Sequence, residues 1–271
     1  MFLSKEICFL EMHRTGSTHL TKILPNHFQN GEQKGFHNRA PKKIYESNIS
    51  FVGSVRNPWD WYVSVWGKGC DAIGITYERL TKKKIYFNNL GLKTKPWMSP
   101  WIFFNQFSKP LEQWREVYSD HNNVENFRKW LKLFLLDRKY DDGTSYGISD
   151  ISKICGQYTY KYLTLFLKND RKLYDNSIKN LADLHKIDKQ YNVLNHVIRS
   201  ENLEEDYFEL LSKFKKEITD TEKIEIKNLK KTNISSRDKN YLKFYDKSSL
   251  ELVKNMEGLI IEKYNYEIPS I

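Results

Sequence analysis

Two short apolar runs, each followed by a turn and the start of a helix, constrain the fold of this chain most. Residues 7–12 form an almost entirely apolar run of strand length, and they lead into a turn of mostly small residues at 14–18. Apolar residues then recur at helical spacing until Pro25, which we expect to end or kink the helix. Residues 49–55 repeat the pattern, and Pro58 follows where the first turn of a helix tolerates proline. Strands that alternate with helices predict an α/β fold with a central, mainly parallel sheet flanked by helices.

The rest of the chain is mostly helical in its pattern. Residues 67–160 predict helices joined by long loops, and they are rich in aromatic side chains. Residues 197–198 predict a brief strand before an amphipathic helix that includes Leu203. Ser248 and Glu251 have the spacing of a capping box, which predicts the start of the last helix.

Composition excludes several classes of protein. Hydrophobic residues make up 39% and charged residues 29% of the chain, which is a globular composition rather than a disordered one. No stretch approaches about 18 apolar residues, so we expect no integral membrane segment. Residues 1–12 carry charges where a signal peptide needs an uninterrupted apolar core. The three cysteines are widely spaced and odd in number, so we expect reduced thiols in a cytoplasmic protein, with neither disulfides nor bound metal.

The net charge of +10 favours an anionic partner. Nucleic acid, a membrane surface and a phosphorylated small molecule all carry the required charge. Residues 1–109 hold 16 Lys and Arg against 7 Asp and Glu, so nearly all of the excess lies there. Because this segment contains Arg14 and Arg56, we expect the excess to serve a site for a small, highly anionic nucleotide.

The two strand-to-helix turns carry the candidate chemistry. A turn of small residues before a helix presents backbone N–H groups at the positive end of the helix dipole, which suits a phosphate, and Arg14 adds a positive charge. The turn is not a Walker motif, because Glu11 and Ser17 stand where that motif needs glycine and lysine. Arg56 ends the second strand, so two parallel strands end in anion-binding groups at one edge of the sheet. A nucleotide with phosphates at opposite ends of its ribose would use both.

Four ordered segments resemble those of sulfotransferases that use 3′-phosphoadenosine 5′-phosphosulfate (PAPS). They are residues 12–18, residues 55–58 with Ser64, residues 198–206, and residues 233–237 with Tyr241 and Tyr245. The resemblance implies a sulfotransferase-like fold with a P-loop-like nucleotide site. Since the segments come from both ends of the chain and serve one nucleotide, we expect residues 1–271 to form a single domain, in which 67–195 is an insertion that shapes the acceptor site.

The resemblance also implies residue roles. The 5′-phosphosulfate would be held by Arg14, Thr15, Gly16, Ser17 and Thr18. The 3′-phosphate would be bound by Arg56 and Ser64, and the nucleotide would be covered by a loop with Asn233, Ser235 and Arg237. His13 and Arg14 replace the proline and lysine common in the family, and the glycine-rich C-terminal loop of the steroid and phenol enzymes is absent. The chain therefore resembles the carbohydrate-modifying and bacterial branch more closely.

Sulfuryl transfer to a hydroxyl group also needs a base with a pKa near neutral. His37 lies between the first two motifs, where the polysaccharide 2-O-sulfotransferase branch has a glycine-histidine pair. We expect His37 to accept the proton of the acceptor, with Glu46, Glu11 and His13 as alternatives. Arg14 would stabilise the departing bisphosphate, so His37 and Arg14 form the predicted catalytic pair.

The sequence leaves the acceptor and the oligomeric state open. A glycan, a lipid head group or a small metabolite with a hydroxyl group all fit, and an amine is the second choice. Two other functions remain as alternatives: an ATP-dependent kinase-type phosphoryl transferase and a basic nucleic-acid-binding protein. The kinase alternative lacks its lysine and metal-binding signature, and the nucleic-acid alternative leaves the four ordered motifs unexplained, so we expect no nucleic-acid partner.

Overall fold

The chain divides into two compact units. The computed structural model describes residues 1–85, 95–137, 145–174, 177–229 and 238–271. Unit 1 comprises Met1–Asn57, Thr164–Lys168 and Tyr191–Ile234. Unit 2 comprises Pro58–Leu163, Asn169–Gln190 and Ser235–Ile271. The expectation of a single domain concerns how these units combine, and it stays a prediction.

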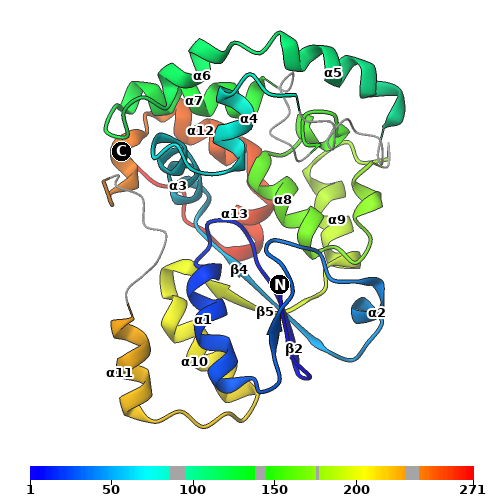
Figure 1. The fold of residues 1–271 in the computed structure, drawn as a ribbon, viewed down its shortest axis with the longest axis vertical. Coiled ribbons are helices and arrows are strands. Elements are labelled where there is room, and N and C mark those ends of the chain that lie inside the picture. The colour runs from blue at the N-terminus through cyan, green and yellow to red at the C-terminus, as the bar shows by residue number, and fades with distance from the viewer. Residues whose placement is uncertain (86–94, 138–144, 175–176, 230–237) are drawn as a thin grey trace. The chain divides into compact units, whose positions relative to one another are not determined.

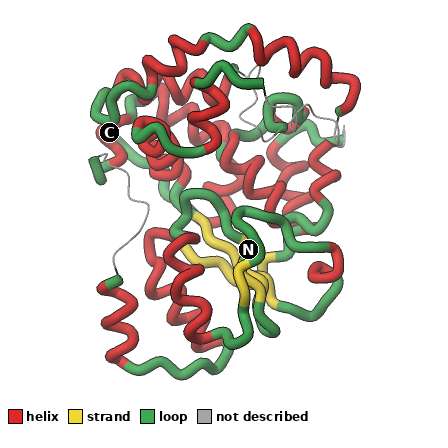
Figure 2. The backbone as a smooth tube through the Cα atoms, viewed as in Figure 1, coloured by secondary structure: helices red, strands yellow, loops and turns green. Residues whose placement is uncertain are grey.

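Unit 1 contains a five-stranded sheet in the order β3-β1-β2-β4-β5 (Figures 1 and 2). Its strands are β1 (Phe2–Leu3), β2 (Ile7–Leu10), β3 (Glu32–Gln33), β4 (Ser50–Val55) and β5 (Leu194–Arg199). β2, β4 and β5 are parallel, whereas β1 pairs antiparallel with both β2 and β3. The α/β prediction is confirmed, but the sheet is mixed rather than mainly parallel. The difference arises because only three residues connect β1 to β2, which is enough for an antiparallel return and far too short for a parallel crossover.

Helices of unit 1 pack on the sheet through apolar side chains. They are α1 (Ser17–His27), α2 (Lys42–Tyr45), α10 (Leu203–Lys213) and α11 (Asp220–Asn228). The 3₁₀ turn η5 (Ser200–Asn202), which has no buried residue, precedes α10. One buried cluster joins apolar residues of α1, α10 and the strands, and the hydroxyl group of Tyr207 donates to the backbone oxygen of Ile23 at 3.2 Å. The predicted strand and helix around residues 197–213 are confirmed. Pro25 does not end its helix, since α1 continues to His27 and loses only the hydrogen bond that an N–H at Pro25 would make.

Unit 2 is helical (Figure 2). Its α-helices are α3 (Pro58–Cys70), α4 (Ile75–Thr81), α5 (Ser99–Phe107), α6 (Leu111–Val117), α7 (Val124–Leu136), α8 (Gln157–Phe166), α9 (Leu181–Tyr191), α12 (Lys247–Met256) and α13 (Gly258–Tyr264), where the last residues of α8 and α9 belong to unit 1. Its 3₁₀ turns are η2 (Pro96–Met98), η3 (Asp150–Lys153), η4 (Asp170–Tyr174) and η6 (Tyr241–Phe244). α3 begins at Pro58, as the sequence predicts. Five tryptophans are fully buried in this unit and form much of its core: Trp59, Trp61, Trp66, Trp114 and Trp130.

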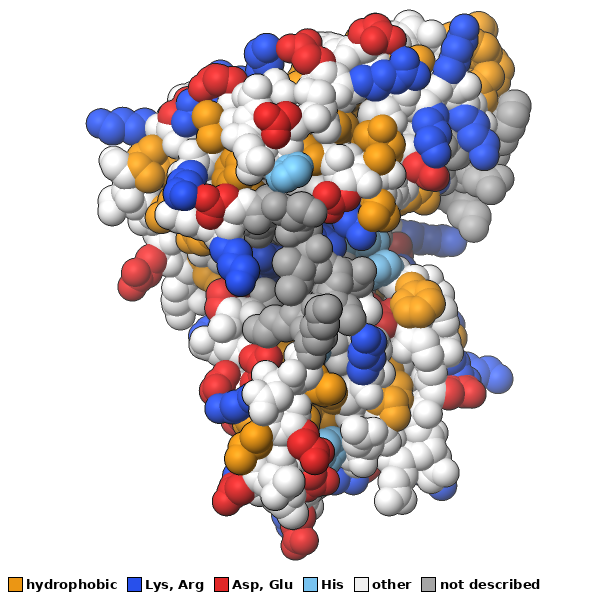
Figure 3. All heavy atoms as spheres, turned by 60° about the vertical axis from the view of Figure 1, so that its left-hand side comes forward, with side chains coloured by type: hydrophobic (Ala, Val, Ile, Leu, Met, Phe, Trp, Pro, Cys, Tyr) orange, Lys and Arg blue, Asp and Glu red, His pale blue; other side chains and the backbone are white. Residues whose placement is uncertain are grey.

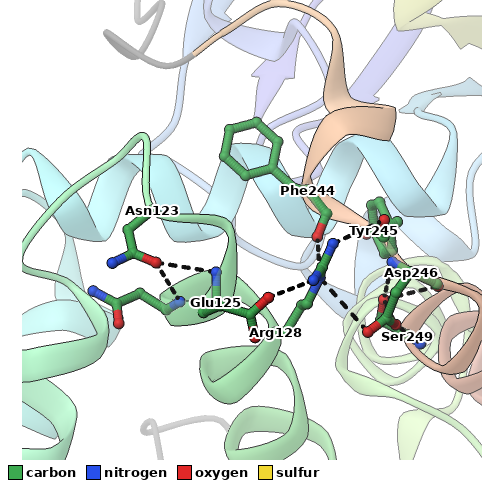
Figure 4. A network of polar contacts seen from close by, with 8 residues as sticks. Asn123, Glu125, Arg128, Phe244, Tyr245, Asp246 and Ser249 are labelled. Carbon is green, nitrogen blue, oxygen red and sulfur yellow. Dashed lines mark hydrogen bonds and ion pairs between the residues drawn. The ribbon is translucent and has the colours of Figure 1, made fainter.

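A polar network in unit 2 joins α7 to the segment before α12 (Figure 4). Arg128 donates to the backbone oxygens of Phe244 at 3.1 Å and Tyr245 at 3.2 Å. Its guanidinium group also lies 3.7 Å from the carboxylate of Asp246. Asp246 and Ser249 form the capping box of α12, so the predicted box of Ser248 and Glu251 is wrong. Aspartate caps a helix as well as serine does, and the observed cap lies two residues before the expected one.

On the face shown in Figure 3, Lys and Arg side chains stand among Asp and Glu side chains. Several Lys side chains of the described residues form ion pairs within one helix, such as Lys213 with Glu209 and Lys254 with Glu251. Exposed pairs of this kind contribute little to stability. None of the described helices is both long enough and apolar enough to cross a membrane.

Candidate functional site

The carboxyl ends of β2 and β4 lie side by side in unit 1. The two strands are parallel neighbours, with Leu10 of β2 opposite Gly53 of β4. The turn that follows β2 and the residues that follow β4 therefore emerge at one edge of the sheet. In α/β proteins, ligands bind outside this carboxyl edge.

The turn between β2 and α1 has an unusual backbone. Arg14 has a φ angle of 62° and Gly16 one of 79°, so both lie in the left-handed region. The oxygen of Gly16 accepts hydrogen bonds from the N–H groups of His19 at 2.9 Å and Leu20 at 3.2 Å, which makes Gly16 the N-cap of α1. A Cβ atom at Gly16 would lie 2.3 Å from Cδ1 of Leu203, at the start of α10. Glycine is therefore required here both by the backbone angle and by close packing.

Thr15 fastens the turn to β4. Its hydroxyl group donates to the backbone oxygen of Met12 at 2.9 Å and lies 2.6 Å from the hydroxyl oxygen of Ser54. Both Thr15 and Ser54 are fully buried. The side chain of Thr15 thus holds the turn in place, and its backbone N–H is the group that the predicted role in phosphate binding would use.

Arg56 connects the end of β4 to the same turn. Its Nη1 atom donates to the backbone oxygen of Arg14 at 3.1 Å. The backbone N–H of the next residue, Asn57, donates to the carboxylate of Glu201. The structure therefore brings together the two arginine segments that the sequence analysis paired.

Ser17 and Thr18 form the first turn of α1. Ser17 is buried and Thr18 is exposed. The first N–H groups of an α-helix have no acceptor within the helix, and they lie at the positive end of its dipole. The eleven-residue α1 begins three residues after Arg14, so N–H donors and a guanidinium group stand close in sequence at the carboxyl edge.

His37 lies beside the turn, held by Glu11 and His13. Its backbone N–H donates to Oε2 of Glu11 at 3.2 Å, and its Nδ1 atom lies 2.9 Å from the backbone oxygen of Glu11. A carbonyl oxygen only accepts, so Nδ1 carries a hydrogen and Nε2 keeps the lone pair when the ring is neutral. The ring of His37 stacks on that of His13, with centroids 3.7 Å apart. Since the side chain is exposed, Nε2 has the tautomer and the access that a general base needs.

The three alternatives for the base lie in different surroundings. Glu11 is buried, and its carboxylate accepts from Gln33 at 2.8 Å as well as from His37, so it acts as an anchor for residues 33–37. His13 belongs to the same cluster through its stacked ring. Glu46 follows α2 and forms an exposed ion pair with Lys42 at 3.6 Å. The cluster of Glu11, His13 and His37 was not expected from the sequence, because it depends on a loop without periodic pattern.

Two parts of the predicted site lie elsewhere. Ser64 is buried in α3, which belongs to unit 2, and its pairing with Arg56 stays a prediction. Asn233, Ser235 and Arg237 fall outside the described residues, so the predicted nucleotide loop also stays a prediction.

Unit 2 contains a buried carboxyl group that the sequence analysis missed. Glu257 is fully buried and accepts from the backbone N–H of Thr159 at 2.8 Å, from the hydroxyl group of Thr159 at 2.6 Å, and from the hydroxyl group of Tyr62. It thereby caps the N-terminus of α8. Burial raises its pKa to about 7, and the hydrogen bonds from Thr159 and Tyr62 oppose that rise. The available signal in the sequence was its place between the apolar stripes of the last two helices.

Compared with protein-family models, with curated proteins and with solved structures, the chain gives no match in any of the three. The resemblance to the sulfotransferases therefore depends on the four sequence segments alone.

Proposed function

We propose that the protein transfers the sulfuryl group of PAPS to a hydroxyl acceptor, and that the turn Arg14–Thr18 and Arg56 bind the nucleotide. The observation that carries the proposal is the bond from Arg56 to the backbone of Arg14, at the common carboxyl edge of β2 and β4. One phosphate at a helix N-terminus needs no second arginine from a neighbouring strand. A nucleotide with two anionic groups needs a second positive charge, and Arg56 supplies it.

Each part of the turn has a role in this proposal. The N–H groups of the first turn of α1 and the guanidinium group of Arg14 bind the 5′-phosphosulfate, while Arg56 binds the 3′-phosphate. Arginine suits both tasks because its fork of N–H donors matches the oxygens of a phosphate. The bond from Thr15 to Ser54 supports the proposal, because it holds the turn before any ligand arrives. Groups that are already in place lose less entropy on binding.

The proposed transfer is an in-line displacement at sulfur. The acceptor oxygen attacks sulfur while its proton passes to Nε2 of His37, and the bond between sulfur and the bridging phosphate oxygen breaks. The electron pair of that bond leaves with adenosine 3′,5′-bisphosphate, whose new negative charge Arg14 stabilises. The hydrogen bond from Nδ1 of His37 to Glu11 supports this role, because it fixes the tautomer that leaves Nε2 as the base.

Nucleotide binding is tested by titration calorimetry with adenosine 3′,5′-bisphosphate and, separately, with adenosine 5′-monophosphate. Arg56→Ala should weaken binding of the bisphosphate roughly 10- to 100-fold, as expected for a charged hydrogen bond. It should weaken binding of the monophosphate less, because the 3′-phosphate is absent there and only the bond from Arg56 to the backbone of Arg14 is lost. Lys22→Ala, an exposed position on α1, is the control and should alter neither affinity. Failure of the unaltered chain to bind the bisphosphate would refute the proposal.

The base is tested by turnover. The protein is incubated with sulfur-labelled PAPS and a panel of glycans, lipids and small alcohols, and labelled products are identified by mass. His37→Asn should reduce transfer roughly 100- to 10,000-fold and leave bisphosphate affinity intact. Glu46→Gln should retain transfer. Near-normal transfer by the His37 variant would assign the base to another residue while leaving nucleotide binding unaffected.

A further inference from the structure

Helix α5 in unit 2 turns an aromatic face to the solvent. Four aromatic side chains on α5 and the preceding η2 turn are exposed: Trp97 (73%), Trp101 (44%), Phe104 (68%) and Phe107 (59%). They are spaced four, three and three residues apart, so they are neighbours on one side of the helix. The opposite side is buried through Ile102 and Asn105. We name the four exposed side chains the aromatic face.

The exposed side of α5 differs from that of an ordinary surface helix. Such a helix buries its apolar side and turns charged or polar residues outward. Residues 99–107 contain no charged side chain at all, and their outward side is aromatic. Contiguous exposed apolar surface of this kind marks an interaction site.

Basic residues flank the aromatic face. Residues 79–109 hold seven Lys and Arg and no Asp or Glu, although Lys82 forms an ion pair with Glu78 at 2.9 Å and Lys95 with Asp150 at 2.8 Å. Just after α5, the amino group of Lys109 donates to the backbone oxygens of Arg79 at 2.8 Å and Lys82 at 3.3 Å. This places the lysine run 82–84 beside the C-terminal end of α5. Lys83 in that run is exposed.

We propose that the aromatic face and the lysine run 82–84 together dock on the surface of a bilayer that contains anionic lipids. Tryptophan and phenylalanine side chains suit the boundary between head groups and acyl chains, and lysines beside them are attracted to anionic head groups. Because the lysines are positively charged and the head groups are negatively charged, we favour such a bilayer as the partner of this surface. An uncharged aromatic helix with basic residues at its end has the composition of an interfacial element, which lies on a membrane and does not cross it.

The distribution of charge argues against single-stranded nucleic acid as the occupant. Proteins that bind it combine stacking rings with basic side chains along one groove, so that each base stacks while its phosphate is neutralised. Here the rings are contiguous on a helix that has no basic side chain, and the lysine run 82–84 stands beside its C-terminal end. The proposal does not depend on the proposed sulfuryl transfer.

The tryptophans give a direct readout of docking. Five of the seven are fully buried, and only Trp97 and Trp101 are exposed. Vesicles of phosphatidylcholine alone, or of phosphatidylcholine with phosphatidylglycerol, are added to the full chain while tryptophan emission is followed. We expect a blue shift with the anionic vesicles, quenching by brominated acyl chains, co-flotation of the protein, and weakening of all three by salt.

Paired variants separate the aromatic and basic contributions. Trp101→Ser with Phe104→Ser keeps Trp97 as reporter and should lower vesicle affinity at least about tenfold. The matched control is Ile224→Ser with Leu229→Ser, two exposed apolar positions in unit 1, which should change nothing. Lys83→Glu should lower the affinity for anionic vesicles at least about fivefold, the contribution of one lysine near such a surface.

A matched reversal at the exposed Lys43 in α2 controls for net charge and should leave vesicle affinity unchanged. All of these positions are exposed, and unchanged circular dichroism spectra will verify that the variants fold. No flotation with anionic vesicles, equal binding to both vesicle types, or equal losses in variants and controls would overturn the proposal. Self-association through the aromatic face, or tighter binding of single-stranded RNA that the aromatic variants abolish, would overturn it in favour of that partner.

Discussion

Replacement of Gly16 by alanine tests the packing that shapes the candidate site. The φ angle of 79° places Gly16 in the left-handed region, which costs an L-residue roughly 1–2 kcal/mol. The new Cβ atom would also lie 2.3 Å from Cδ1 of Leu203, a side chain that is only 4% exposed. Overpacking of a core costs typically 1–3 kcal/mol. We therefore expect Gly16→Ala to lower the free energy of unfolding by roughly 2–5 kcal/mol.

Gly35 provides the matched control. Its φ angle is 71°, close to that of Gly16, and a Cβ atom there would meet the end of the Asn38 side chain. Asn38 is exposed and can move away. Gly35→Ala should therefore cost only the backbone contribution of roughly 1–2 kcal/mol. The difference between the two variants measures the contact with Leu203.

The assay must report on unit 1. All seven tryptophans lie in unit 2, so tryptophan fluorescence follows the wrong unit. Urea unfolding is better followed by far-UV circular dichroism, and native-state hydrogen exchange of amides in β2 and β4 gives the difference for unit 1 alone.

A double variant tests the same contact from the other side. Leu203→Ala alone removes a buried side chain and should cost roughly 2–5 kcal/mol. Combined with Gly16→Ala it should cost less than the two single losses together, because the smaller side chain leaves room for the new Cβ atom. If Gly16→Ala costs no more than Gly35→Ala, or if the two losses simply add, then Leu203 does not restrict the turn and our account of Gly16 is wrong.

Three further predictions concern polar groups that are buried or half-buried. Burial raises the pKa of Glu257 from 4.5 to about 7, so the stabilisation by its protonated form is fully present below about pH 4.5 and is lost as the pH rises through 7. The free energy of unfolding should therefore fall by up to about 3 kcal/mol across this range. Glu257→Gln should remove this dependence on pH, because glutamine does not titrate. Arg128→Ala should cost about 1–2 kcal/mol in thermal or urea unfolding, because three hydrogen bonds are lost, whereas the exposed neighbour Lys129→Ala should stay within about 0.5 kcal/mol. Thr15→Val should cost about 1–3 kcal/mol and Ser54→Ala in the same chain should recover part of the loss, since no buried hydroxyl is then left without its partner.

The sequence predicted the parts of the fold that repeat a pattern over several residues. The start of α3 at Pro58 and the strand and helix around residues 197–213 follow from proline preference and helical periodicity. β1 and β3 contain two residues each, too few for any alternation to appear, so the mixed character of the sheet could not be predicted. The cap of α12 was placed wrongly because several polar residues near its start have capping-box spacing, and only the backbone of Asp246 decides among them.

The candidate site, too, could be predicted from the sequence only in part. Arg14 and Arg56 could be paired from the sequence because each follows a parallel strand, and parallel strands end at one edge. The position of His37 could not be derived similarly, because it depends on a left-handed φ angle of 54° and on bonds to Glu11, 26 residues away. Glu257 and Tyr62 are 195 residues apart in the chain, and no periodic pattern in the sequence indicates their contact.

The positive charge of residues 1–109 is unevenly distributed along this segment. The excess of +9 in residues 1–109 favoured a nucleotide site because Arg14 and Arg56 lie in that segment. Residues 1–78 hold nine Lys and Arg against seven Asp and Glu, whereas residues 79–109 hold seven against none. Most of the excess therefore belongs to residues 79–109 and not to the turn after β2. The geometry of Arg14 and Arg56, and not the net charge, therefore supports nucleotide binding. The larger part of the positive charge favours an anionic surface as a separate partner.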